Sequence, residues 1–338
     1  MDDNGTLLSV KDLSTHFFTE DGTVRAVQDV SFSIGRGRTF ALVGESGCGK
    51  TATALSIMRL VQAGQGRIVG GEIVFEGEDL LRLSERRMRA VRGNRIAMIF
   101  QEPMSSLNPV YSVGGQIAEA IRLHQGKGRK EAWAHAVEML RRVGIGEAER
   151  RARGYPHQMS GGMCQRVMIA MAVCCEPGLL IADEPTTALD AATEKRILDL
   201  LSELQRQNGM SILLITHDLG IAAERADEIG VMYASRMVET GDSQRVCGEP
   251  LHPYTRGLWE SLPRPGFSGK RLPSIPGNVP DLLRLPAGCK FHPRCPNAES
   301  DKRCRSVEPE LREVEVGRCV ACRHAPGYEE AHSVKCRV

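Results

Sequence analysis

The chain has 338 residues, more than a single hydrophobic core usually supports, which predicts one large domain plus an appendage. Apolar residues make up 41% and charged residues 25%, the composition of an ordinary globular protein, which excludes a disordered chain. The formal net charge of +2 is too small to indicate nucleic acid or an anionic membrane as a partner.

Neither a signal peptide nor a membrane span is expected. The first residues, MDDNGTLLSV, are acidic and lack the basic-then-apolar pattern of a signal peptide. The longest apolar run, VMIAMAVCC, is less than half of the ~20 residues that a spanning helix needs. We therefore expect a cytosolic chain that reaches a membrane only through a partner.

Apolar strand patterns alternate with helical patterns over most of the chain. The expected strands are TFALV at 39–43, IAMIF at 96–100, LLIAD at 179–183 and SILLIT at 211–216. This alternation predicts an α/β domain with a largely parallel sheet. Ten of the seventeen prolines lie between Pro250 and Pro296, and six of the eleven cysteines lie between Cys289 and Cys336. The change predicts a boundary near residue 260, followed by a proline-rich linker and a cysteine-rich tail.

A phosphate loop, GESGCGKT at residues 44–51, follows the strand at 39–43 and precedes a helical pattern. It fits G-x-x-x-x-G-K-[ST] in the strand-loop-helix context that this motif requires. Its glycines allow successive backbone N–H groups to surround phosphate oxygens, and the helix N-terminus adds its dipole. Lys50 is expected to reach the outer phosphates, and the Thr51 hydroxyl to hold Mg²⁺.

Three further groups lie at the ends of strands. Asp183 is placed to hold the Mg²⁺ shell, and Glu184 to polarise a water for attack on the γ-phosphate, although alone such a pair is more often a solvated helix cap. His217 can contact the γ-phosphate or, as the alternative, cap a helix beside Asp218. Gln101 is a metal and water contact only in the company of the other motifs.

The turn SGG at residues 160–162 is a second anion site, because Ser160 begins a helix and the N–H groups that follow have no helical acceptor. These motifs and ALD at 188–190 occur in the order and spacing of the ATP-binding-cassette (ABC) ATPases, which the chain resembles over about residues 7–262. In that family the residues matching Ser160, Gly161 and Gly162 cap the γ-phosphate of an ATP held by a facing subunit. The resemblance thus implies a dimer with ATP between its subunits.

The resemblance also implies the fold and the site. The fold is an ABC-type P-loop ATPase domain at 1–262, with a helical subdomain at about 104–175, and a small Cys-rich extension at 263–338. Catalysis is assigned to Glu184, His217 and Gln101, Mg²⁺ to Thr51 and Gln101, and the in-trans surface to Ser160, Gly161, Gly162 and Asp190. The expected ATP contacts are Phe17, Gly44, Ser46, Gly47, Cys48, Gly49, Lys50, Thr51 and Asp183. Phe18 competes with Phe17 for adenine, and the alternative is that both rings pack in an N-terminal sheet.

A narrower resemblance concerns transport. The stretches QEPMSSLNPVYSVGGQI, HPYTRGLWESLP and GCKFHPRCP are similar to the dipeptide, oligopeptide and nickel importer ATPases. This branch implies a second, related ATPase subunit, two membrane permease subunits docked on the helical insertion at 113–158, an external binding protein, and a peripheral location on the cytoplasmic face of the membrane. Peptide uptake is favoured; opine, nickel or oligosaccharide uptake and a non-transport soluble ABC ATPase are the alternatives.

The tail cysteines suggest a metal, because disulfides are rare in cytosolic chains. Their spacing matches neither the common zinc pattern nor the ferredoxin run, so zinc, an iron-sulfur cluster and free thiols all stay open. Relatives with a similar CxFHPRC segment imply a [4Fe-4S] cluster on Cys289, Cys295, Cys304 and Cys322, with zinc as the alternative. Cys319 is a spare thiol or a competitor for Cys322, and Cys336 is not expected to be a ligand.

Overall fold

The computed structural model describes residues 5–62, 64–187, 189–262 and 273–331. The chain divides into two compact units. Unit 1 comprises Met1–Gly35, Thr39–Leu81 and Leu214–Val338, and unit 2 comprises Arg36–Arg38 and Arg82–Leu213. Strand β8 (Ser211–Thr216) carries the chain from unit 2 into unit 1.

An antiparallel sheet opens unit 1. It contains β1 (Thr6–Thr19), β2 (Gly22–Gly35), β4 (Gly66–Phe75) and β5 (Glu78–Asp79) in the order β2-β1-β4-β5. Strands β1 and β2 form a hairpin closed by pairing of Thr19 with Gly22. This sheet departs from the expected largely parallel arrangement. The short, predominantly apolar strands on which that expectation rests are typical of parallel sheets, whereas β1 and β2 mix buried with exposed residues, as antiparallel sheets do. The turn residues are Glu20 and Asp21, and Gly22 follows them at φ 135°, a conformation that favours glycine.

The second sheet of unit 1 combines parallel and antiparallel pairs. Strand β9 (Glu228–Tyr233) is parallel to the fully buried β3 (Thr39–Val43) and antiparallel to β10 (Arg236–Asp242). The tail extends it, because β12 (Arg318–Val320) pairs with β10 and with β11 (Arg312–Glu315). The helices of this unit are α1 (Lys50–Ile57), α9 (Leu219–Arg225), α10 (Ser243–Gly248) and α11 (Pro253–Glu260).

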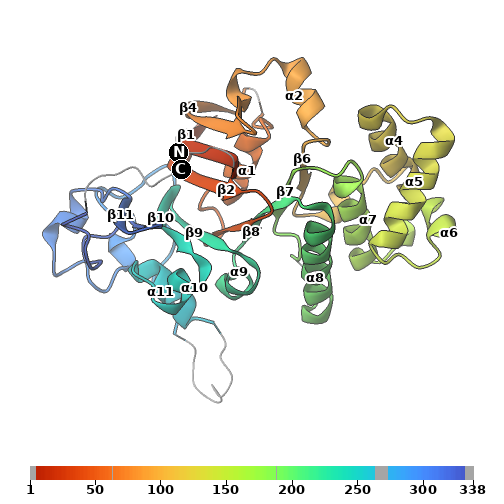
Figure 1. Ribbon diagram of the computed structural model, residues 1–338. Coiled ribbons are helices and arrows are strands. Elements are labelled where there is room, and N and C mark those ends of the chain that lie inside the picture. The colour runs from red at the N-terminus through yellow and green to blue at the C-terminus, as the bar shows by residue number, and fades with distance from the viewer. Residues whose placement is uncertain (1–4, 63, 188, 263–272, 332–338) are drawn as a thin grey trace. The chain divides into compact units, whose positions relative to one another are not determined.

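Unit 2 contains the parallel pair β6 (Ile96–Ile99) and β7 (Leu179–Asp183), both fully buried. Its helices are α2 (Glu85–Val91), α3 (Pro103–Ser106), α4 (Val113–Gln125), α5 (Arg129–Arg142), α6 (Ala148–Ala152), α7 (Gly161–Val173) and α8 (Ala191–Asn208). Figure 1 shows α4, α5 and α6 side by side as one yellow helical group, which matches the helical insertion expected at 113–158. In the described parts of the chain, no helix is both long enough and apolar enough to cross a bilayer.

The α/β fold class is confirmed, and the N-terminal caps follow the sequence locally. Ser112 caps α4 by accepting the N–H of Gly115, and Asp190 caps α8 by accepting those of Ala192 and Thr193. Short polar side chains at these positions satisfy amides that have no partner within the helix. The predicted domain boundary near residue 262 and the limits of the helical subdomain stay predictions.

Candidate functional site: a nucleotide site and a cysteine tail

The backbone of the phosphate loop requires glycine at two positions, Gly44 and Gly49. A Cβ atom on Gly44 would lie 2.2 Å from the Met232 carbonyl oxygen, and one on Gly49 would lie 2.2 Å from that of Ala26. Gly49 also has φ 110°, a conformation that residues with a side chain rarely adopt, and it precedes the first residue of α1. The loop is thus held against neighbouring backbone, and Ser46 and Gly47 are exposed in its middle.

Lys50 folds back over this loop. It is 4% exposed, and its Nζ donates hydrogen bonds to the carbonyls of Gly44 at 2.7 Å and Glu45 at 3.1 Å. Thr51 is exposed in the first turn of α1. Cys48 is buried beneath the loop, and burial raises the pKa of its thiol. The sequence-predicted lysine therefore lies in the concave loop where a polyphosphate is expected.

Two predicted catalytic residues of unit 2 are in direct contact. The Gln101 Nε2 donates to the Glu184 carboxylate at 3.0 Å, and the Thr187 hydroxyl donates to the same oxygen at 2.9 Å. Glu184 has φ 44°, which is rare for a residue with a side chain and often marks a functional site. Asp183, 2% exposed, ends β7. The carboxylate of Glu184 is thus held in one orientation by two hydrogen-bond donors.

The SGG turn of unit 2 is the start of α7. The Ser160 hydroxyl accepts the Met163 N–H at 3.4 Å, and the buried Gln165 donates to the Pro185 carbonyl at 2.6 Å, which ties α7 to the turn after Glu184. A pocket of about 470 Å³ opens beside the turn. It is lined by Ser160, Gly162, Met163 and Thr193, together with Arg151, Arg166 and Arg196. The sequence did not predict these three arginines; with one carboxylate, Glu147, also in the lining, they leave the pocket net positive, which favours an anion.

His217 and Phe17 belong to unit 1. His217 is exposed directly after β8, and Asp218, rather than the histidine, caps α9 by accepting the N–H groups of Gly220 and Ile221. Phe17 packs against Gly66, where an added Cβ would lie 2.7 Å from its ring. Phe18 is 42% exposed and lies under the Arg67 guanidinium. The assignment of Phe17 to adenine stays a prediction.

The four cysteines predicted as cluster ligands, Cys289, Cys295, Cys304 and Cys322, line one small cavity together with His292 and His324. Burial, reinforced by the neighbouring thiols, raises the pKa of Cys289 to about 12 and that of Cys322 to about 11. The Nδ1 of His292 lies 2.9 Å from the Cys289 carbonyl oxygen, a contact that holds the ring against the turn after Cys289. Cys319 is disulfide-bonded and therefore neither a spare thiol nor a competitor. Cys336 lies outside the described residues.

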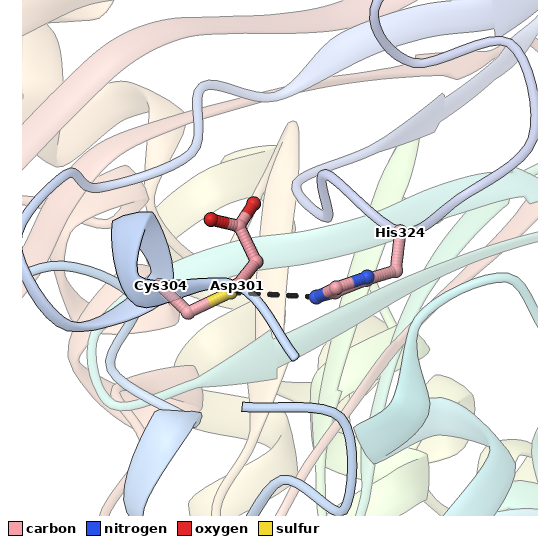
Figure 2. Close-up of side chains that lie close together, drawn as sticks. All are labelled: Asp301, Cys304 and His324. Atoms are coloured by element: carbon pink, nitrogen blue, oxygen red, sulfur yellow. Dashed lines mark hydrogen bonds between the residues drawn. The ribbon is translucent and has the colours of Figure 1, made fainter. Parts of the chain in front are cut away.

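Figure 2 shows a second arrangement in the tail, in which the Cys304 thiol faces the His324 ring beside Asp301. The Cys304 Sγ lies 3.5 Å from the His324 Nε2, and the ligand atoms of all three residues lie within 4.8 Å of one another. Asp301 also accepts from the Arg303 N–H and guanidinium. The sequence analysis missed His324, although the Cys322-Arg323-His324 spacing was a signal that could have pointed to it.

Two arginines anchor the tail to the rest of unit 1. Arg294 forms a bidentate ion pair with Glu45 of the phosphate loop, and Arg318 pairs with the wholly buried Glu239. Partners so distant in the chain leave no local pattern in the sequence.

Comparisons with known proteins agree with this architecture. The family model described as ABC transporter matches residues 27–187, and the model described as oligopeptide/dipeptide transporter, C-terminal region, matches residues 238–304. A solved dimeric ATP-binding cassette with bound ADP and phosphate aligns with a TM-score of 0.63, at 24% identity over 70% of this chain and 99% of its own. A cassette from Clostridium perfringens, part of an ABC transporter complex, aligns with a TM-score of 0.61, at 27% identity over 72% of this chain and 92% of its own. Fold and phosphate loop together define an ABC-type ATPase.

Relatives that are similar over nearly the whole chain show which branch of the ABC-type ATPases this chain belongs to. A probable peptide ABC transporter ATP-binding protein of Sinorhizobium fredii is 52% identical over 94% of both chains. The dipeptide transport ATP-binding protein of Escherichia coli is 48% identical over 94% of this chain and 96% of its own. The chain therefore belongs to the family of peptide ABC transporter ATP-binding proteins.

Proposed function

We propose that the chain is the ATP-hydrolysing subunit of an ABC importer that powers uptake of dipeptides or oligopeptides. The observation that carries this proposal is the identity of about half of all residues to peptide-import ATP-binding proteins over nearly the whole length, including the C-terminal region. The proposed partners are a second, related ATPase subunit, two permease subunits and an external binding protein. The chain is then a peripheral protein on the cytoplasmic face of the membrane.

Each site residue has a proposed role. Lys50 and the loop N–H groups bind the phosphates of ATP, Thr51, Gln101 and Asp183 hold Mg²⁺, and Phe17 stacks on adenine. When bound, Mg²⁺ would neutralise the negative charge that develops on the transferred phosphoryl group. Glu184, oriented by Gln101 and Thr187, accepts a proton from the attacking water, and His217 contacts the γ-phosphate.

A second subunit completes the proposed site. Ser160, Gly161 and Gly162 of one subunit cap the γ-phosphate bound by the other, with Asp190 on the same face. The positive pocket beside Ser160 supports this role, because a helix N-terminus flanked by arginines favours an anion. ATP therefore holds the two subunits together, and removal of the γ-phosphate releases them and resets the transporter.

An uptake assay tests the substrate. In cells that lack the gene for this chain, we expect loss of labelled dipeptide uptake, restored by the wild-type chain and by Glu203→Gln, which alters an exposed carboxylate of α8. Glu184→Gln should fail to restore it. If dipeptide uptake persists without the chain, while uptake of an opine, nickel or an oligosaccharide is lost, peptide transport is contradicted. The assignment to an ABC importer would then still hold.

We further propose that Cys289, Cys295, Cys304 and Cys322 hold a [4Fe-4S] cluster, and the donor set fits. Four thiols lining one buried cavity are the usual ligand set of such a cluster. A single zinc ion needs sulfurs about 3.8 Å apart, given Zn–S bonds of about 2.3 Å in a tetrahedron. Among the described residues, no three of these cysteines have sulfurs all within 4.8 Å of one another, so in any three at least one sulfur pair is farther apart than a single zinc ion requires.

Metal analysis after anaerobic purification tests the cluster. We expect a brown protein with about four irons and four sulfides per chain, and loss of both in Cys295→Ser. Cys247→Ser is a matched control, since Cys247 is a buried thiol of α10. One zinc per chain, or no metal, would contradict the cluster and leave the ATPase assignment untouched.

A further inference from the structure

The cysteine tail contacts the phosphate loop at Glu45. Three separate groups hold this residue. Its N–H donates to the Tyr254 phenol oxygen at 2.9 Å, its carbonyl accepts from the Lys50 Nζ at 3.1 Å, and its carboxylate is bound by Arg294. The residues that follow Glu45 supply the N–H groups expected to surround the phosphates. The position of Glu45 therefore sets where these N–H groups begin.

The ion pair between Arg294 and Glu45 has the geometry of a strong interaction. The two guanidinium nitrogens lie 2.6 and 3.1 Å from the two carboxylate oxygens, and the Arg294 side chain is only 4% exposed. The Nε of Arg294 donates to the Pro276 carbonyl at 2.8 Å, and its Nη1 lies 3.5 Å from the Tyr233 hydroxyl. A buried bidentate arginine of this kind fixes its partner in one orientation.

The fold of the tail fixes the position of Arg294 itself. Arg294 ends a 3-10 turn, His292–Arg294, that follows Phe291 and precedes Cys295. The Phe291 ring contacts Tyr233 edge-on at 5.2 Å between centroids and Tyr254 at 5.4 Å. Tyr254 is the same residue that accepts the Glu45 N–H. A single aromatic cluster therefore supports both the tail turn and the phosphate loop.

We propose that Arg294 is a positioning residue for the phosphate loop. Arg294 holds Glu45 in place only when the cysteine tail is folded, and through Glu45 it sets the affinity of the loop for ATP. With the pair intact, the loop is ordered before the nucleotide arrives, so binding does not have to order it. Without the pair, part of the binding free energy orders the loop. The cost falls on binding and not on the chemical step, because Arg294 touches neither the Gln101-Glu184 pair nor the reacting phosphate.

The test compares Arg294→Ala, Arg294→Lys, Glu45→Gln and the double variant Glu45→Gln/Arg294→Ala with the wild-type chain. The control is Arg305→Ala, which alters an exposed arginine of the same tail segment. For Arg294→Ala we expect Kd and KM for ATP to rise about tenfold, with kcat at saturating ATP within about twofold of wild type. Arg294→Lys should be intermediate, and the double variant should match Arg294→Ala, because both changes break one interaction.

Wild-type Kd in a folded Arg294→Ala, or additive effects in the double variant, would overturn the inference. If Arg294→Ala does not fold, wild-type Kd in both Arg294→Lys and Glu45→Gln overturns it, and a raised Kd in both supports it. The inference rests on the proposed ATPase function, but different results contradict each of them. If the wild-type chain and Arg305→Ala do not bind ATP, the proposed function fails.

Discussion

The buried ion pair between Arg318 and Glu239 predicts a large loss of stability when the arginine is removed. The Arg318 Nη2 lies 3.1 Å from the Glu239 Oε1, and the two side chains are 3% and 0% exposed. Glu239 also accepts the N–H groups of Leu251 at 3.0 Å and His252 at 2.9 Å, and Arg318 donates to the Glu249 carbonyl. Arg318→Ala would leave Glu239 as a buried carboxylate with only two amide donors.

Removing one partner of a buried ion pair costs about 3–5 kcal/mol. The two amides that remain on Glu239 place the expected loss near the lower end, at about 3 kcal/mol, which corresponds to a fall in Tm of about 6–12 °C for a unit of this size. The assay is urea and thermal unfolding of the full chain. Arg303→Ala is the matched control, because the Arg303 side chain is 56% exposed and its ion pairs with Asp301 and Glu329 should contribute less than about 1 kcal/mol.

Arg318→Ala within about 1 kcal/mol of wild type would refute this reasoning, since the pair would then behave like an exposed one. The double variant Arg318→Met/Glu239→Leu distinguishes the charge from the packing. Replacement of both charges by apolar side chains should recover most of the lost stability, because no uncompensated charge stays buried.

Three further predictions follow from the contacts around the nucleotide site. Lys50→Ala should lose tight ATP binding in an equilibrium titration while still unfolding cooperatively; retained affinity would contradict the role of Lys50. Gly49→Ala should abolish ATP binding, because its Cβ meets the Ala26 carbonyl, whereas Gly77→Ala, also at positive φ but with open space around it, should bind normally. Burial lowers the pKa of His252 to about 3, well below its ordinary value of about 6.5, so the unfolded chain binds a proton that the folded chain does not, and stability should fall as pH drops from about 6.5 towards 3. The His252 Nδ1 accepts the Tyr254 N–H, and His252→Asn should flatten this dependence in unfolding measurements at several pH values; an unchanged slope would contradict the assignment.

The sequence predicted the features that depend on residues close together along the chain. The phosphate loop between a buried strand and a helix, the helical insertion and the α/β class all follow from patterns within a few tens of residues. The Gln101-Glu184 contact joins two strand ends, and parallel neighbours such as β6 and β7 bring their carboxyl ends to the same edge. The pattern of strands thus anticipated where these side chains lie.

Interactions that depend on the tertiary fold could not be predicted in this way. Arg294 and Glu45 are 249 positions apart, and Arg318 and Glu239 are 79 apart. An exposed arginine and a buried, paired one have the same local sequence context, because the difference lies in the partner. The Asp301-Cys304-His324 group was missed for a similar reason, since the short spacing of His324 from Cys322 gives no sign that its partner is Cys304, 20 positions away.

The central claim is that Glu184 activates water in a site completed by a second subunit, and the most direct measurement is made on Glu184→Gln with ATP. The glutamine keeps the shape of the side chain and removes the proton acceptor. We expect hydrolysis to stop while the purified ATPase chain, alone or with its related partner chain, elutes from size-exclusion chromatography as an ATP-loaded dimer. Hydrolysis at the wild-type rate would contradict the role of Glu184, and a monomer at saturating ATP would contradict the shared site.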